Sequence, residues 1–148
     1  MIVYYAAPLF TLAEIEFNSN LVERMNKISN IEFIVPQERS HLFSSKKDMA
    51  KDCFRQIDKC DLVLACMDGP DADSGTCVEL GYAIAKNKKT ICFRTDFRQG
   101  EENGANIMIV YGCTEYLLLN SLDYDLDMIA KTLVYSMSGM TIPNAMFV

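Results

Sequence analysis

The chain has 148 residues, which is most simply one domain spanning residues 1–148, with room for a sizeable buried core. Half of its residues are hydrophobic, the net charge is −6, and the sequence pI is about 4.7. Such an acidic chain lacks the basic surface that nucleic-acid polymers and anionic membranes require, so we expect neither as a partner. Its longest apolar runs are too short to span a bilayer.

Strands and helices alternate along the chain. Strands are predicted at 2–7, 31–35, 61–67, 90–94 and 115–119, helices at 11–28, 48–57, 76–87 and 122–137, and polar loops at 37–47 and 95–104. The first strand has no basic region before it, so it does not resemble a signal peptide. The apolar tail after Gly139 is expected to dock on its own domain or on a neighbour.

This alternation predicts an α/β fold, a flavodoxin-like doubly wound sheet of five parallel strands in the order 2-1-3-4-5. Ligands of such sheets bind beyond the carboxyl ends of the strands, near the point where the strand order reverses. Here those ends are the segments 5–10, 36–40, 67–75 and 94–106. We therefore expect the functional residues in these four segments and in the helices that follow them.

The cysteines and the single histidine exclude several kinds of chemistry. No two of the six cysteines form a CxxC pair, and His41 is the only histidine, so the spacing of a zinc site is missing. With one histidine and no GxSxG motif, Ser-His-Asp and Cys-His hydrolases are disfavoured. We expect reduced cysteines in a cytoplasmic protein that needs neither a metal nor a cofactor.

The segment DGPDADSGTCVELGYAIA, residues 68–85, raises two interpretations of Glu79. Thr76 and Glu79 fit a capping box, in which each side chain satisfies a backbone amide at the start of the helix. Alternatively, Glu79 points into the cleft at the end of the central strand, where the helix dipole would keep it ionised as a nucleophile. The crowding of Asp68, Asp71 and Asp73 in the same turn favours the second interpretation, because such crowding is costly unless a ligand uses some of them.

An ionised carboxylate of this kind suits attack on an anomeric carbon, which leads through a glycosyl ester to retention of configuration. At this point the segment DADSGTCVELGYAIAKNKKTI resembles the signature of the nucleoside 2-deoxyribosyltransferases. YYAAPLFTLAE, KDCFRQIDKCDLVLACMDG and RTDFR…NIM resemble three further elements of that family, in the right order. The resemblance implies transfer of 2-deoxyribose from one nucleobase to another, in nucleoside salvage.

The resemblance also implies roles for single residues. Glu79 matches the nucleophile, and Asp73 matches an acid that hydrogen-bonds the base. Asp52 matches a second acid near the reacting centre, with a one-residue offset in spacing. Tyr5 matches the first-strand tyrosine that orients the nucleophile.

Four further residues are assigned to substrate binding. Asn106 and Met108 match a pair that reaches into the site of a neighbouring subunit and binds the sugar 5′-hydroxyl, which implies a homo-oligomer with shared active sites. Gly75 belongs to the signature turn, and Phe10 provides apolar cover after the first strand. The implied partners are a 2′-deoxynucleoside and a free nucleobase.

Each candidate also has an interpretation without function. Tyr5 and Met108 could be core residues, and Asn106 could cap a short helix. Asp52 falls in the charged run KKDMAKD, which is typical of a solvated helix face. Asp73 is a natural turn residue.

Two other functions remain open. A 2′-deoxynucleoside 5′-phosphate N-hydrolase would use the same glutamate but needs a phosphate cradle of free backbone amides after the first strand. Here that loop is AAPLFTLAE, where proline removes one donor, although Arg39, Ser40 and Ser74 could still bind a phosphate. A non-enzymatic nucleoside-binding module would keep the pocket without requiring Glu79.

Overall fold

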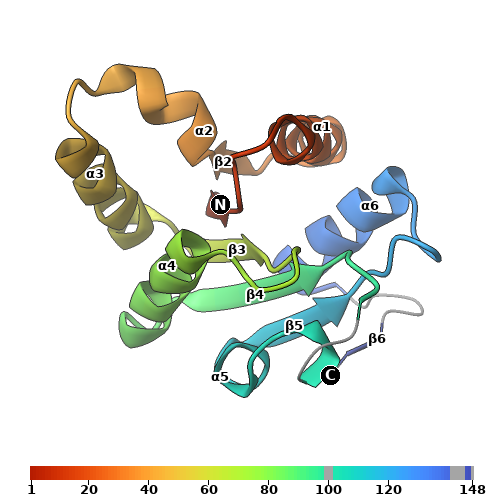
Figure 1. Ribbon diagram of the computed structural model, residues 1–148. Coiled ribbons are helices and arrows are strands. Elements are labelled where there is room, and N and C mark those ends of the chain that lie inside the picture. Colours follow the sequence, from red (N-terminus) through yellow and green to blue (C-terminus); the bar gives the residue numbers. More distant parts are fainter. Residues whose placement is uncertain (99–101, 141–145, 148) are drawn as a thin grey trace.

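The computed structural model describes residues 1–98, 102–140 and 146–147, and these build a sheet flanked by helices (Figure 1). The strands are β1 (Ile2–Ala6), β2 (Glu32–Ile34), β3 (Leu62–Cys66), β4 (Lys89–Arg94), β5 (Glu115–Leu118) and β6 (Met146–Phe147). They lie in the order β2-β1-β3-β4-β5-β6. The first five are parallel, so the predicted fold and strand order are confirmed.

The short strand β6 pairs antiparallel with β5 and was not predicted. It belongs to the apolar tail, of which residues 141–145 and 148 lie outside the described residues. Residues 99–101 of the predicted polar loop lie outside them as well.

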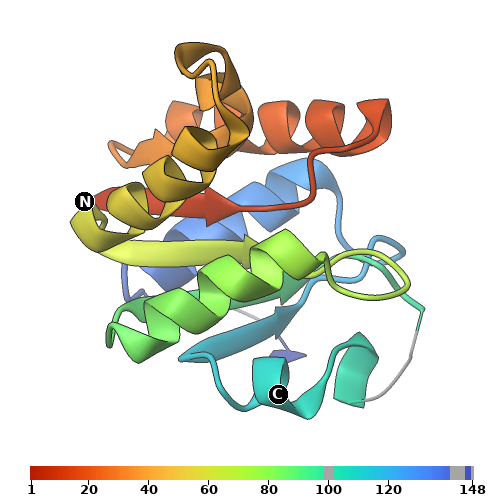
Figure 2. The ribbon, with the colours of Figure 1, turned by 60° about the vertical axis from the view of Figure 1, so that its left-hand side comes forward.

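Two layers of helices cover the sheet (Figures 1 and 2). Helices α1 (Leu12–Ile28) and α6 (Leu126–Met137) pack together on one face, and α3 (Lys46–Lys59) and α4 (Ser74–Ala85) pack together on the other. Shorter helical turns occupy two segments predicted as loops: α2 (Pro36–Arg39), η1 (Ser40–Leu42) and η2 (Glu102–Gly104). A further short helix, α5 (Ile107–Val110), precedes β5. No helix in the described ranges is both long and apolar enough to cross a membrane.

Alternation along β1 decides which side chains can reach the functional edge. Val3 and Tyr5 belong to the core that α1 and α6 cover, whereas Tyr4 and Ala6 belong to the core under α3 and α4. Successive side chains of a strand point to opposite faces of its sheet. The adjacent residues Tyr4 and Tyr5 therefore lie on opposite faces of the sheet.

Arg94 joins the loops at the carboxyl edge of β3 and β4. Its side chain is 2% exposed, and the guanidinium donates hydrogen bonds to the carbonyl oxygens of Met67 and, at 2.9 Å, Gly69. Asp68 accepts from the backbone amides of Thr95 at 2.6 Å and Asp96 at 2.9 Å. Asp68 is thus occupied by the neighbouring loop, which corrects the expectation that a ligand explains the acid crowding at this residue.

Candidate active site

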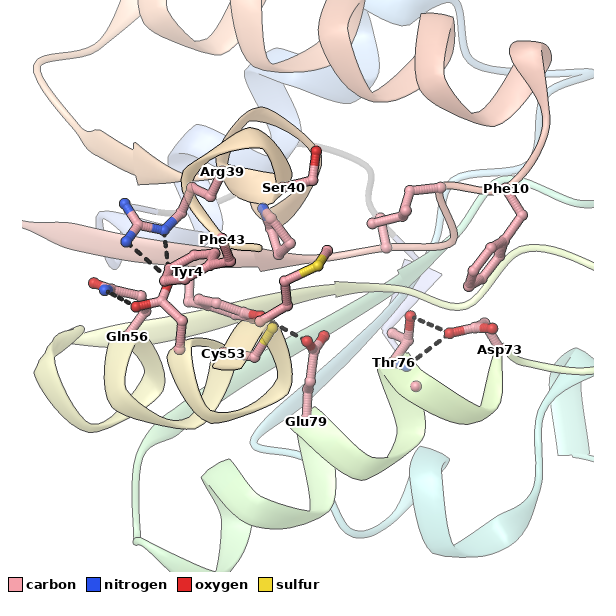
Figure 3. A pocket seen from close by; sticks show the side chains of 16 residues that line it. Tyr4, Phe10, Arg39, Ser40, Phe43, Cys53, Gln56, Asp73, Thr76 and Glu79 are labelled. Atoms are coloured by element: carbon pink, nitrogen blue, oxygen red, sulfur yellow. Dashed lines mark hydrogen bonds and ion pairs between the residues drawn. The ribbon is translucent and has the colours of Figure 1, made fainter. Parts of the chain in front are cut away.

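A pocket of about 730 Å³, counting its open mouth, lies at the carboxyl edge of β1 and β3, between α3 and α4 (Figure 3). This is the point where the strand order reverses, as expected for a doubly wound sheet. Its walls come from the loop after β1, from α2 and the turn after it, from α3, and from the start of α4. The lining residues are Tyr4, Ala7, Leu9, Phe10, Pro36, Arg39, Ser40, Phe43, Met49, Asp52, Cys53, Gln56, Asp73, Gly75, Thr76 and Glu79.

Glu79 lies at the middle of this pocket and does not cap its helix. Helix α4 begins at Ser74, so Glu79 is its sixth residue, and the proposed capping box with Thr76 is wrong. The cap is Asp73, whose carboxylate accepts from the backbone amide of Thr76. Instead, Glu79 Oε1 accepts a 2.6 Å hydrogen bond from the hydroxyl of Tyr4, which arrives from β1 (Figure 3).

The environment of Glu79 raises its pKa. Burial is the largest cause, hydrogen bonds from Tyr4 and Cys53 oppose it, and the charge of Asp73 adds to the rise. We expected the helix dipole to favour the charged form of Glu79, but burial has the largest effect on its pKa and acts in the opposite direction. Burial also raises the pKa of Tyr4 strongly, so this tyrosine keeps its proton and acts as a donor to the carboxylate.

Tyr5 does not orient Glu79. Its hydroxyl donates to Asn18 Oδ1 at 3.0 Å on the opposite face of the sheet, and the residue is part of the core there. The contact predicted for Tyr5 is made by Tyr4, its neighbour in the sequence. The alternative interpretation of Tyr5, a core residue with a satisfied hydroxyl, describes its position.

Asp52 lines the pocket, but it is held by a cation and is not on a solvated helix face. Its Oδ2 accepts from Arg39 Nε at 2.8 Å, and its Oδ1 accepts from Gln56 Nε2 at 2.9 Å. Burial would raise the pKa of Asp52, but the hydrogen bonds from Arg39 and Gln56 and the charge of Arg39 outweigh it, so the pKa is lowered. The side chain that interacts with both Tyr4 and Glu79 is that of the next residue, Cys53 (Figure 3).

The substrate-binding candidates separate into two groups. Gly75 and Phe10 line the pocket, with Phe10 74% exposed at its mouth. Asn106 and Met108 do not line it within the chain: Asn106 Oδ1 caps α5 through the Met108 amide at 2.9 Å, and the Met108 side chain is 75% exposed. Their donation to a neighbouring subunit therefore stays a prediction.

Sequence reasoning missed several residues that line this pocket. Tyr4 is the neighbour of Tyr5, and the alternation of side chains along a strand could have indicated it. Cys53 is the neighbour of Asp52, and the one-residue offset in the spacing at Asp52 could have indicated it. Phe43, Met49 and Gln56 carried no comparable signal, because the wall that Phe43 forms with these two residues of α3 depends on how the 37–47 segment folds. Among the described residues, no cluster of three or more His, Cys, Asp or Glu side chains could hold a metal ion.

The cap and the chemistry of Asp73 can be separated by two substitutions. Asp73→Asn should keep the cap, because asparagine caps helices as well as aspartate does, whereas Asp73→Ala should lower the free energy of unfolding by about 0.5–2 kcal/mol. If the carboxyl group assists departure of the base, both variants lose turnover. Urea denaturation and initial rates measure the two effects, and an Asp73→Asn variant with full activity would reduce Asp73 to a cap.

The chain is similar to known proteins in sequence and in fold. A family model described as nucleoside 2-deoxyribosyltransferase matches residues 3–113. A solved 2-desoxiribosyltransferase from Leishmania mexicana is 23% identical over 73% of this chain and 84% of that chain, with a TM-score of 0.62. The 2-deoxyribosyltransferase from Bacillus psychrosaccharolyticus is 20% identical over 88% and 90%, with a TM-score of 0.69.

A third solved structure is described as a CMP N-glycosidase, BcmB, from Clostridium botulinum. It is 18% identical, covers 93% of this chain and 99% of that chain, and has a TM-score of 0.61. At these identities the solved structures show a shared fold. Among individual proteins with curated descriptions, none is significantly similar to this chain in sequence.

Proposed function

Because this chain belongs to the nucleoside 2-deoxyribosyltransferase family, whose members act on N-glycosidic bonds, we propose that it moves 2-deoxyribose between nucleobases through a covalent ester on Glu79. The observation that carries this proposal is the position of the Glu79 carboxylate, which lines the pocket and accepts a 2.6 Å hydrogen bond from Tyr4. A carboxylate with little hydration is a stronger nucleophile than one in water, and the rise in its pKa reflects that loss of water.

The reaction proposed here has two displacements at the anomeric carbon. In the first, the bond between C1′ and the base nitrogen breaks, its electron pair goes to the base, and a Glu79 oxygen bonds to C1′. In the second, a nitrogen of the incoming base attacks C1′, the bond between C1′ and Glu79 breaks to release the carboxylate, and the proton of that nitrogen passes to Asp73. Both pass through an oxocarbenium-like transition state, and two inversions retain the configuration.

Tyr4 and Asp73 have supporting roles in this proposal. The Tyr4 hydroxyl holds one Glu79 oxygen and leaves the other to react. Asp73 lies at the pocket wall at the start of α4, where it can share a proton with a ring nitrogen of the departing base. The apolar wall made by Leu9, Phe10 and Phe43 suits the faces of a planar base.

The alternative is hydrolysis of a 2′-deoxynucleoside 5′-phosphate, and contacts in the loop after β1 argue against it. The backbone amides of Phe10 and Thr11 donate to Glu14 Oε2 at 2.8 and 2.7 Å, and Pro8 has no amide proton. Two of the amides that could form a phosphate cradle in this loop are therefore occupied by a carboxylate. This supports substrates without a phosphate.

A homo-oligomer and a cytoplasmic setting are also part of the proposal. Ile107, Met108 and Tyr111 are exposed on and beside α5, which suits donation of Asn106 and Met108 to a neighbouring subunit. All six cysteines are unpaired, as is usual in a reducing compartment.

One reaction tests the proposed function against both alternatives. The protein is incubated with 2′-deoxyinosine and free adenine, and all four species are followed by chromatography. Appearance of 2′-deoxyadenosine is the result expected for transfer. Hypoxanthine without a new nucleoside would indicate hydrolysis, and no change in either nucleoside would point to a binding module. The same assay with 2′-deoxynucleoside 5′-phosphates tests for a nucleotide substrate.

A further inference from the structure

We propose that Asp52 is a specificity-determining residue, which holds the Arg39 guanidinium so that the pocket accepts uncharged nucleosides and rejects their 5′-phosphates. The inference rests on the proposed function and identifies the charge class of its substrate. It assigns Asp52 a role in selection, in place of the acid at the reacting centre that the resemblance implied.

The Arg39–Asp52 pair is built into the pocket wall. Both Arg39 Nε and Arg39 Nη2 lie 2.8 Å from Asp52 Oδ2. The other carboxylate oxygen accepts from Gln56 Nε2 at 2.9 Å and lies 3.7 Å from Arg55 Nη2. Asp52 is only 7% exposed, so its carboxylate is fixed by these partners and shielded from water. Figure 3 shows Arg39 and Gln56 on the same side of the pocket as Phe43.

Arg39 is the only cationic side chain among the described residues that line the pocket, and three carboxylates line it as well, those of Asp52, Asp73 and Glu79. Arginine binds phosphate through its N–H groups, and Arg39 already directs two of its nitrogens, Nε and Nη2, to Asp52 Oδ2. A phosphate dianion entering this pocket would meet net negative charge and a guanidinium whose Nε and Nη2 already contact Asp52. A neutral nucleoside meets neither obstacle.

Removing the charge of Asp52 should reverse this selection. In Asp52→Asn the side chain keeps its shape and an oxygen for Gln56, but it no longer neutralises Arg39. The guanidinium becomes available to an anion, and one negative charge leaves the pocket. We expect the affinity for 2′-deoxynucleoside 5′-monophosphates to rise at least about tenfold, with a much smaller change for the nucleosides.

The test is isothermal titration calorimetry with the four common 2′-deoxynucleosides, 2′-deoxyinosine and their 5′-monophosphates. The matched control is Asp48→Asn, which removes the same charge from α3 at an exposed residue 3.9 Å from Lys51 and outside the pocket. The double variant Asp52→Asn with Arg39→Gln should lose the gain, because no cation remains in the pocket. Asp52→Ser repeats the test should Asp52→Asn fail to fold.

The outcomes separate this inference from the proposed function. Wild-type protein that binds none of the nucleosides would contradict the proposed function. Wild-type protein that binds nucleosides, with no gain of monophosphate affinity in either Asp52 variant, would overturn only the inference. A gain of equal size in Asp48→Asn would overturn it too, because general charge would then explain the effect. Wild-type protein that binds monophosphates as tightly as nucleosides would also overturn the inference, because the pocket would then not reject the phosphate.

Discussion

Replacing Glu79 with glutamine should lower the turnover of deoxyribosyl transfer by on the order of 10⁴-fold or more, the scale seen when a nucleophile is removed. The amide keeps the shape of the side chain and can still accept from Tyr4, so nucleoside binding should persist. Initial rates with 2′-deoxyinosine and adenine measure the loss, and titration calorimetry measures binding. Residual transfer at more than a hundredth of the wild-type rate would contradict a nucleophilic Glu79.

The same substitution should stabilise the folded protein at neutral pH. The pKa of Glu79 is raised in the fold, so the charged form of this side chain is disfavoured there. The stability that Glu79 contributes is therefore present below its unfolded pKa and is lost as pH rises through its folded pKa. Glutamine carries no charge, so the variant does not lose this stability. Such a gain is expected where a residue needed for activity lowers the stability of the fold. Thermal unfolding should show a higher Tm for Glu79→Gln than for wild type at pH 7, and a smaller difference below the unfolded pKa of about 4.3. A lower Tm at pH 7 would contradict the burial of this charge.

The second large effect is expected from Tyr4→Phe, with Tyr5→Phe as its matched control. Tyr4→Phe removes the 2.6 Å hydrogen bond to Glu79, and a bond to a charged group contributes about 1.5–3 kcal/mol, or roughly a 10–150-fold loss in kcat/KM. Losing that donor also raises the pKa of Glu79 further, so the acidic limb of the pH profile should move to higher pH.

Tyr5→Phe makes the same chemical change one residue later and on the other face of the sheet. It removes the bond to Asn18, so it should cost stability on the order of 1 kcal/mol but leave the pH profile in place. Rates measured across pH 4–9 for both variants decide between the two tyrosines. Equal losses of kcat/KM, or a shifted profile in Tyr5→Phe alone, would contradict the orienting role of Tyr4.

Periodicity and the resemblance together predicted the fold, because buried parallel strands and amphipathic helices leave a strong pattern in the sequence. The five parallel strands and their order follow that pattern. The short helix α5 (Ile107–Val110) was raised only as the alternative in which Asn106 is a cap, and strand β6 (Met146–Phe147) was not predicted, because so few residues show no period. The start of α4 was placed two residues late, since Asp73 and Thr76 are both common helix caps and Thr76 is followed by Glu79 at the spacing of a capping box.

The sequence located the pocket better than it located the single residues in it. Glu79, Asp73 and Asp52 all line one cavity. The choice between Tyr4 and Tyr5 depends on strand register, where a shift of one residue moves a side chain to the other face. The pairing of Arg39 with Asp52 depends on the conformation of a loop and two turns between β2 and α3, which no local pattern determines.

The ester on Glu79 can be observed directly by rapid-quench mass spectrometry of the protein during turnover of a 2′-deoxynucleoside. We expect a 2-deoxyribosyl adduct in the peptide that contains Glu79, which fragmentation places on that side chain and which disappears when a second base is added. Transfer that proceeds with no adduct at any time, or with an adduct on another carboxylate, would contradict the mechanism.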